Sequence, residues 1–364
     1  MMLDRRFWFG IDWLLVLGLL LAAGLGVAII YSATQGGPTP DYYKRQILWV
    51  GLGLVLMLLV MAIDYHSLLD HAEFFYVAVT GLLVYLLFFG SLRAGTNRWL
   101  ELGAFTMHSG ELAKLASVVL LAKYFAAVRK NRLGTAEVAI TGALVGVPTL
   151  LVILQPDLGT AATLVMAYAV LCLLAGLRGR LVVVASVIFA LALPLGWSFV
   201  LKDYQKERVQ AFLDPNLDPR GAGYQSIQST ISVGSGGLAG KGWLKGSQSQ
   251  LQFLPAPHTD FVFAVIGEEF GFVGVVAVLL LYLMITIRCL DAGRRARDRL
   301  GIYLVAGILA MFVFQALYNM AMVGGLVPIK GFPLPLVSYG GSSMMTTLVG
   351  FGLILNVRMR RFVN

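Results

Sequence analysis

A carboxylate that could act on a substrate stands at position 260, directly before a long apolar stretch. Asp260 ends a polar segment, and the apolar stretch runs from Phe261 to Cys289. A helix N-terminus stabilises a carboxylate, so capping is one interpretation. A carboxylate at an accessible mouth can also be a general base or a metal ligand. His258 lies two residues away, but a single His-x-Asp is a weak metal signal, and both interpretations stay open.

Glu111 and Lys114 lie inside another apolar stretch, from Gly110 to Val128. An ionisable group within a membrane helix costs about 2.5–3.5 kcal/mol on insertion scales. Residues three apart share one helical face and can pair. A structural ion pair that fixes helix packing and a charged wall of a polar cavity are compatible interpretations.

Other polar residues favour structural roles. Asp157 follows Gln155 and Pro156 at an expected helix start and is interpreted as a cap. Glu268 and Glu269 form a second acidic spot, interpreted as mainly structural. The glycine-dense segment 234–243 is no Walker motif, and a flexible loop is the default expectation. Rossmann, zinc and nucleophile-elbow patterns do not occur, which argues against a nucleotide-driven machine.

Composition predicts a membrane protein. Of the 364 residues, 58% are hydrophobic and 13% are charged, with a mean hydropathy of +0.80. Soluble domains carry about 25% charged residues. The net charge of +9 is therefore not a nucleic-acid signal, because basic residues of membrane proteins collect in cytoplasmic loops. The two cysteines, Cys172 and Cys289, lie in or beside apolar stretches and predict neither a disulfide nor a thiolate metal site.

Apolar stretches near 20 residues, the length that crosses a bilayer, predict an all-α bundle of about ten transmembrane helices. They lie at 11–32, 46–63, 72–90, 110–128, 137–154, 158–177, 181–201, 262–289, 301–326 and 335–356. Gly271 and Gly274 predict a tilt or kink in the eighth. The whole chain, 1–364, is expected to form one domain, with no cleavable signal peptide.

Lys and Arg predict the orientation. One set of loops and both termini hold Arg5, Arg6, the basic loop 129–132, Arg178, Arg180, the loop 294–299 and the tail 358–361; the opposite loops hold Lys44, Arg45, Arg93, Arg98 and Lys330. The positive-inside rule places both termini in the cytoplasm. It places the segment 202–260, between the seventh and eighth helices, outside, where its apolar residues predict short interfacial helices.

Several uncommon strings, in one order along nearly the whole chain, resemble the SEDS (shape, elongation, division, sporulation) family. They are NRWL (97–100), QPDLGT (155–160), GSGGLAGKGW (234–243), GSQSQLQFLP (246–255), HTDFVFAV (258–265) and PLPLVSYGGS (333–342). The segments 240–243 and 248–255 are more similar to the elongation members than to the division members.

The resemblance implies a polytopic glycosyltransferase of the bacterial cytoplasmic membrane that polymerises lipid II. The 4-hydroxyl of one glycan would attack the anomeric carbon of another, with inversion and release of undecaprenyl pyrophosphate. The family's essential aspartate falls on Asp260, as general base. Because an ordinary aspartate is a weak base, Asp260 should be partly desolvated or should hold a divalent cation, Mg²⁺ or Mn²⁺. Metal dependence is an expectation from the family.

The resemblance also implies supporting residues. The family's intramembrane ion pair falls on Glu111 and Lys114, and its loop arginine falls on Arg208, a natural partner for pyrophosphate oxygens. Trp99 is expected to pack sugar or lipid or to be an interfacial anchor. Asp157, Ser338 and Tyr339 lie in matching strings and are expected to support the substrate site.

Two strings depart from the family. Gln-Pro-Ser-Glu is replaced by His108-Ser109-Gly110-Glu111, which predicts a changed start of that helix. Leu-Pro-Glu is replaced by Leu254-Pro255-Ala256, which puts any role of that glutamate in doubt.

Three functions stay open from the sequence. The favoured one is the glycosyltransferase, of elongation or division type. A lipid II flippase would use charges such as Glu111 and Lys114 at the bilayer midplane and would not need Asp260. A scaffold would need no particular polar residue. The resemblance implies a class B penicillin-binding protein and the elongation complex as partners, besides lipid II, the lipid-linked glycan and membrane lipids, and no nucleic acid.

Overall fold

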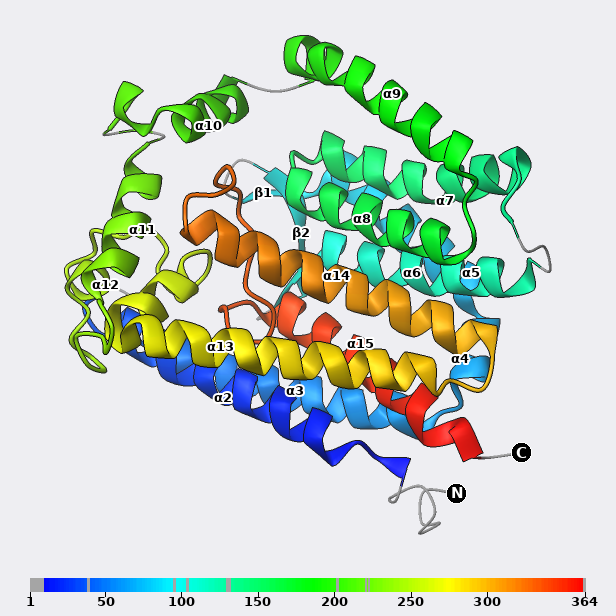
Figure 1. The fold of residues 1–364 in the computed structure, drawn as a ribbon, viewed down its shortest axis with the longest axis horizontal. Coiled ribbons are helices and arrows are strands. Elements are labelled where there is room, and N and C mark those ends of the chain that lie inside the picture. The colour runs from blue at the N-terminus through cyan, green and yellow to red at the C-terminus, as the bar shows by residue number, and fades with distance from the viewer. Residues whose placement is uncertain are drawn as a thin grey trace.

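The protein is a bundle of long helices in this computed structural model (Figure 1). The structure describes residues 10–37, 40–93, 96–102, 105–128, 132–200, 203–219, 221 and 223–362. Ten long helices in these ranges correspond to the ten predicted spans: α2 (Trp13–Thr34), α3 (Tyr42–Ala62), α5 (Ala72–Phe89), α6 (Ser109–Ala127), α7 (Thr135–Leu154), α8 (Leu158–Leu174), α9 (Gly179–Leu195), α13 (Val262–Arg294), α14 (Arg299–Val323) and α15 (Gly341–Met359). The predicted all-α polytopic bundle is confirmed.

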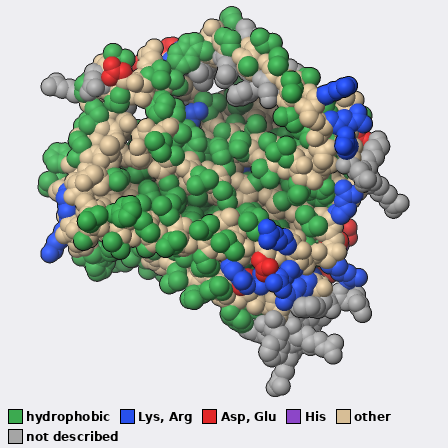
Figure 2. Space-filling model, viewed as in Figure 1, with side chains coloured by type: hydrophobic (Ala, Val, Ile, Leu, Met, Phe, Trp, Pro, Cys, Tyr) green, Lys and Arg blue, Asp and Glu red, His purple; other side chains and the backbone are tan. Residues whose placement is uncertain are grey.

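The bundle has the composition of a multi-pass membrane protein. Within the described ranges six helices, α2, α3, α5, α7, α13 and α14, are long and apolar enough to cross a membrane. Helix α6 carries Glu111 and Lys114 but is buried along most of its length, so its charges do not face lipid. Figure 2 shows hydrophobic side chains over the middle of one face, with Lys and Arg gathered mainly toward the end that carries both termini.

Short helices cover the opposite end of the bundle (Figure 1). They are α10 (Asp203–Leu213), a 3₁₀ turn (Pro215–Leu217), α11 (Tyr224–Ser235) and α12 (Ser247–Gln250). The prediction of short helices within 202–260 is therefore confirmed. A further short helix, α4 (Tyr65–Asp70), joins α3 to α5 at the end that carries the termini.

Helix α13 is kinked at Gly271, as its glycines predicted. The Gly271 backbone has φ 62° and ψ −157°, a region that favours glycine. A Cβ there would lie 2.4 Å from the amide nitrogen of Gly240. The glycine-dense segment packs against this kink, because the N–H of Lys241 donates to the Glu268 carbonyl at 3.0 Å and that of Phe272 to the Gly237 carbonyl at 2.9 Å. The expectation of a flexible loop at 234–243 is wrong, since these glycines allow the close approach of two backbones.

A three-stranded antiparallel sheet, which the sequence analysis did not predict, lies between α5 and α6. Its strands are β1 (Ser91–Arg93), β2 (Thr96–Leu102) and β3 (Phe105–His108), in the order β1-β2-β3. Trp99 pairs with His108 in the β2–β3 register. The strands are too short for a clear alternating pattern, yet they carry Arg98, Trp99 and His108 to the start of α6.

Candidate active site

Two adjoining cavities lie near the end of the bundle that the short helices cover. One has a volume of about 500 Å³ and the other about 370 Å³. Both are lined by Arg98, Asp157, Gly159, Asp260 and Gly331. The larger cavity also meets α10 and α11, whereas the smaller one extends toward the start of α6 and α15. The shared residues join the two cavities into one polar site.

Asp260 faces this site and is not a helix cap. The N-cap of α13 is Phe261, so the capping interpretation is wrong. Within the described residues the Asp260 carboxylate has neither a hydrogen bond nor an ion pair, and it lies against Gly331, whose Cβ would be 3.4 Å from Oδ2. Burial raises the pKa of Asp260 to about 6, although the charges of Arg208 and Arg98 oppose the rise. The side chain is therefore a stronger base than an ordinary aspartate.

The backbone around Asp260 is fixed by α14 and by the loop between α14 and α15. Asn319, fully buried in α14, donates from Nδ2 to the carbonyl of Asp260 at 2.8 Å and to that of Phe332 at 2.6 Å. Ser338 Oγ donates to the Thr259 carbonyl, and the Tyr339 N–H donates to the His258 carbonyl at 2.9 Å. The predicted support residues Ser338 and Tyr339 thus act on the chain beside Asp260. Asn319 was missed, although an amide inside an apolar helix is itself a signal of a buried polar contact.

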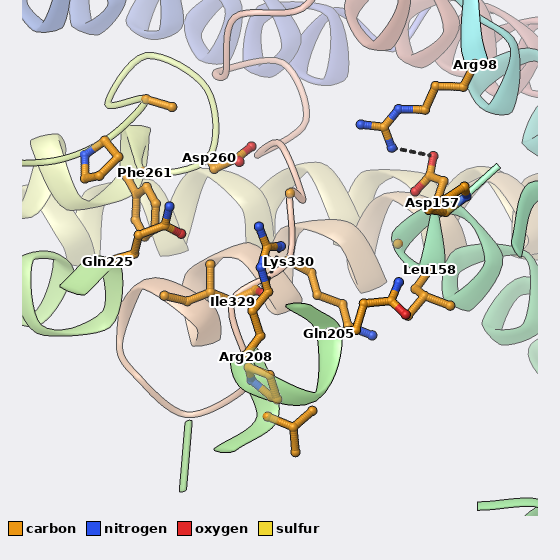
Figure 3. A pocket seen from close by; sticks show the side chains of 17 residues that line it. Arg98, Asp157, Leu158, Gln205, Arg208, Gln225, Asp260, Phe261, Ile329 and Lys330 are labelled. Atoms are coloured by element: carbon orange, nitrogen blue, oxygen red, sulfur yellow. Dashed lines mark hydrogen bonds and ion pairs between the residues drawn. The ribbon is translucent and has the colours of Figure 1, made fainter. Parts of the chain in front are cut away.

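Asp157 shows the opposite arrangement, although it lines the same cavities. It caps α8 by accepting from the Thr160 N–H at 3.1 Å and from the Thr160 hydroxyl at 2.8 Å, as predicted. His108 Nε2 lies 3.3 Å and Arg98 Nη1 3.5 Å from Oδ2 (Figure 3 shows the Arg98 contact). Burial opposes ionisation, but the His108 hydrogen bond and the charges of His108 and Arg98 outweigh it and hold the pKa of Asp157 well below its usual range.

Glu111 and Lys114 form the predicted ion pair within α6. Lys114 Nζ lies 2.8 Å from Glu111 Oε1, and both side chains are buried. Both residues line a small cavity of about 30 Å³ between α6, α14 and α15, and Glu111 and Gln315 also line the 370 Å³ cavity. The pair therefore lies where α6, α14 and α15 meet and forms part of the inner wall of the site.

Comparison with known proteins agrees with the motifs. The family model of the cell cycle proteins FtsW, RodA and SpoVE matches residues 5–362. The chain belongs to this family. These are the SEDS proteins, and the peptidoglycan glycosyltransferase MrdB of Escherichia coli (strain K12) is similar, with 40% identity over 349 residues covering 96% of this chain and 92% of that protein.

Two solved SEDS structures share the fold. A chain from a peptidoglycan synthase complex, in which polymerization and crosslinking are coordinated, has a TM-score of 0.83 and 34% identity, covering 97% of this chain and 99% of its own length. The rod shape determining protein RodA of Thermus thermophilus has a TM-score of 0.73 and 30% identity, covering 98% of this chain and 99% of that protein.

Arg208 and Trp99, which the SEDS resemblance singled out, both reach the site. Arg208 projects from α10 into the 500 Å³ cavity, and its Nη1 lies 3.5 Å from the Ile329 carbonyl oxygen. Trp99 lines the 370 Å³ cavity and packs edge-to-face on His108, with ring centroids 5.1 Å apart. An aromatic wall beside polar groups suits sugar binding.

The change from the SEDS pattern before Glu111 has a steric explanation. A Cβ at Gly110 would lie 2.9 Å from Cε1 and 3.1 Å from Nδ1 of the His108 ring. Glycine at 110 therefore leaves room for histidine at 108. The His108 ring occupies this space, and its Nε2 lies 3.3 Å from Asp157 Oδ2.

His258 and the pair Glu268–Glu269 lie apart from the cavity linings. The His258 ring packs on Tyr42 and Tyr339, with centroids 5.0 and 5.9 Å apart. Glu268 accepts from Lys241 at 2.6 Å, and Glu269 accepts from the Ser32 hydroxyl. These glutamates fasten the outer segment and α2 to α13, so the structural interpretation is confirmed.

Proposed function

We propose that this protein is a peptidoglycan glycosyltransferase of the elongation type, which polymerises lipid II and so maintains rod shape. The observation that carries the proposal is the Asp260 carboxylate, without an ion-pair partner in the described residues and facing a polar cavity lined by Arg98 and Arg208. The names of the similar SEDS proteins support the reaction. A second candidate, the division-type polymerase, would use the same site.

In the proposed reaction Asp260 acts as the base and Arg208 supplies positive charge to the leaving group. Asp260 takes the proton of the acceptor's 4-hydroxyl as the oxygen attacks the anomeric carbon of the donor from the side opposite the pyrophosphate. The anomeric C–O bond breaks, its electrons pass to undecaprenyl pyrophosphate, and the new β-1,4 bond has inverted configuration. Arg208 stabilises the negative charge that develops on the leaving group. Trp99 packs the sugar, and the ion pair Glu111–Lys114 keeps the inner wall polar.

A divalent cation is compatible with these residues only if the substrate supplies ligands. Within the described part of the chain no three His, Cys, Asp or Glu side chains form a cluster that could hold a metal. Mg²⁺ is commonly held by one or two carboxylates together with substrate phosphates. Asp260 would be the protein ligand for Mg²⁺ or Mn²⁺, which would supply positive charge at the hydroxyl and the leaving group. No nucleotide is required.

We place the protein in the bacterial inner membrane with both termini in the cytoplasm and the site facing outward. The distribution of Lys and Arg supports this orientation. The partner is a class B penicillin-binding protein of the elongation complex, which crosslinks the strands. The similarity to a chain solved within a peptidoglycan synthase complex supports such a partner.

The experiment is polymerisation of purified lipid II in liposomes with the cognate transpeptidase, comparing wild type with Asp260→Ala. The proposal expects long glycan strands from wild type and none from the folded, partner-bound variant. Equal polymerisation by both would remove Asp260 from the mechanism. If neither polymerises but lipid II crosses the bilayer, the flippase is the better description.

A further inference from the structure

Lys330 is a cation of the site that the mechanism above does not use. It lies in the loop between α14 and α15 and lines the 500 Å³ cavity together with Asp260 and Arg208. Its backbone N–H donates to the sulfur of Met322, which fixes the chain at this point. Within the described residues its ammonium group has neither a hydrogen bond nor an ion pair, so it projects into the cavity unpaired.

The surroundings of Lys330 disfavour its own charge. Burial lowers the pKa of Lys330, the charge of Arg208 lowers it further, and the charge of Asp157 opposes both. Arg208 lies close by, because its guanidinium contacts the carbonyl of Ile329, the residue next to Lys330. In Figure 3 the side chains of Arg208 and Lys330 lie below Asp260 and Asp157, and all four residues line the same cavity. Two cations that repel one another in a half-buried cavity mark a place where an anion is stabilised.

Neither aspartate of the cavity, Asp157 or Asp260, supplies this anion to Arg208 and Lys330. Asp157 is engaged by Thr160, His108 and Arg98, and Asp260 makes no ion pair with either cation. A ligand with two adjacent anionic groups could contact the guanidinium and the ammonium at once. A guanidinium binds phosphate oxygens in a fork, whereas an ammonium acts as a point charge, so the two cations are complementary.

We propose that Lys330 is a second pyrophosphate-binding residue, which with Arg208 clamps the diphosphate of the lipid-linked donor beside Asp260. This inference rests on the proposed function and deepens it. The two cations come from different elements, α10 and the loop that follows α14. That loop also holds the chain beside Asp260, because Ser338 donates to the Thr259 carbonyl, and Asn319 of α14 links the carbonyls of Phe332 and Asp260. The clamp therefore positions the donor relative to the base. It also stabilises the negative charge that the leaving pyrophosphate gains when it takes the electron pair of the breaking C–O bond.

Binding of farnesyl pyrophosphate to the purified full-length protein in detergent tests the clamp without polymerisation. Farnesyl monophosphate is the comparison ligand, because it offers a single anionic group. We expect wild type to prefer the pyrophosphate, and Lys330→Ala to weaken its binding at least about tenfold with a smaller effect on the monophosphate. Lys330→Arg keeps most of the preference. Lys44→Ala removes an exposed lysine that pairs with Asp41 and lines neither cavity, and this variant should bind as wild type does.

Lys330→Ala should unfold no more readily than wild type, because among the described residues the side chain has no hydrogen bond or ion pair to lose. The proposal is overturned if wild type shows no preference for the pyrophosphate, or if Lys330→Ala and Lys44→Ala bind equally well. Polymerisation assayed in parallel separates the two claims. If wild type polymerises lipid II and Lys330→Ala binds the pyrophosphate as well as wild type does, the clamp is wrong and the proposed function stands. If wild type binds the pyrophosphate through Lys330 but does not polymerise lipid II, the proposed function is wrong and the clamp stands.

Discussion

Two aspartates of this protein stand before transmembrane helices and line the same cavities, yet their chemistry differs. Asp157, before α8, is surrounded by Thr160, His108 and Arg98, and its pKa lies well below the usual range. Asp260, before α13, is without a partner in the described part of the chain, and burial raises its pKa to about 6. Partners, more than burial itself, decide which carboxylate is held as a fixed anion and which is left to exchange a proton.

The largest expected effect comes from replacing each aspartate by asparagine. Loss of a general base should lower kcat/KM about 10²–10⁴-fold in Asp260→Asn. Asp157→Asn, which removes charge from a supporting group, should lower it about tenfold. Lipid II turnover with the partner transpeptidase measures both. Equal losses of kcat/KM in the two variants would mean that the carboxylates share one role, and the distinction between a base and a fixed anion would be wrong.

The pH dependence should report Asp260 and not Asp157. The base must be ionised, so kcat/KM should fall about tenfold per pH unit below the pKa of about 6 and level off above it. Asp157→Asn releases Arg98, whose charge then lowers the pKa of Asp260, so its profile should shift to lower pH. A profile that stays flat from pH 7 to pH 5 would exclude Asp260 as the base.

Stability should respond with opposite signs. Asp157 is stabilised as an anion, so its contribution is present above the unfolded pKa and is lost as the pH falls; Asp157→Asn should cost about 1 kcal/mol at pH 7. The pKa of Asp260 is raised on folding, so its ionised form costs stability as the pH rises toward and above about 6. Asp260→Asn should therefore raise the unfolding temperature at pH 7, with little change near pH 4. Thermal unfolding in detergent at both pH values measures this.

The smallest effect is expected at Asn319, which holds the backbone of Asp260. Asn319→Ala should lower kcat about threefold with KM little changed, because the base is displaced while the substrate cavities remain. Thr149→Val, which removes a buried hydroxyl from α7, is the matched control and should leave kcat unchanged. A rise in KM alone would show that Asn319 shapes the cavity and does not position the base.

The ten helices, the kink at Gly271 and the pair Glu111–Lys114 could all be predicted from the order of residues along the chain. Span length and the cost of charge in lipid act within one stretch of chain, and residues three apart on a helix meet whatever surrounds them. The family motifs also singled out Asp260 and Arg208, although a motif assigns a role and not a set of contacts.

Which of the two carboxylates lacks a partner among the described residues depends on how the helices pack. The partners of Asp157 come from β2, β3 and α8, and those that fix the backbone of Asp260 come from α14 and the loop before α15. The structure likewise decided that Lys330 faces Arg208 across more than a hundred residues of chain. Such contacts depend on how helices far apart in the sequence pack together, and no local pattern of residue types records that packing.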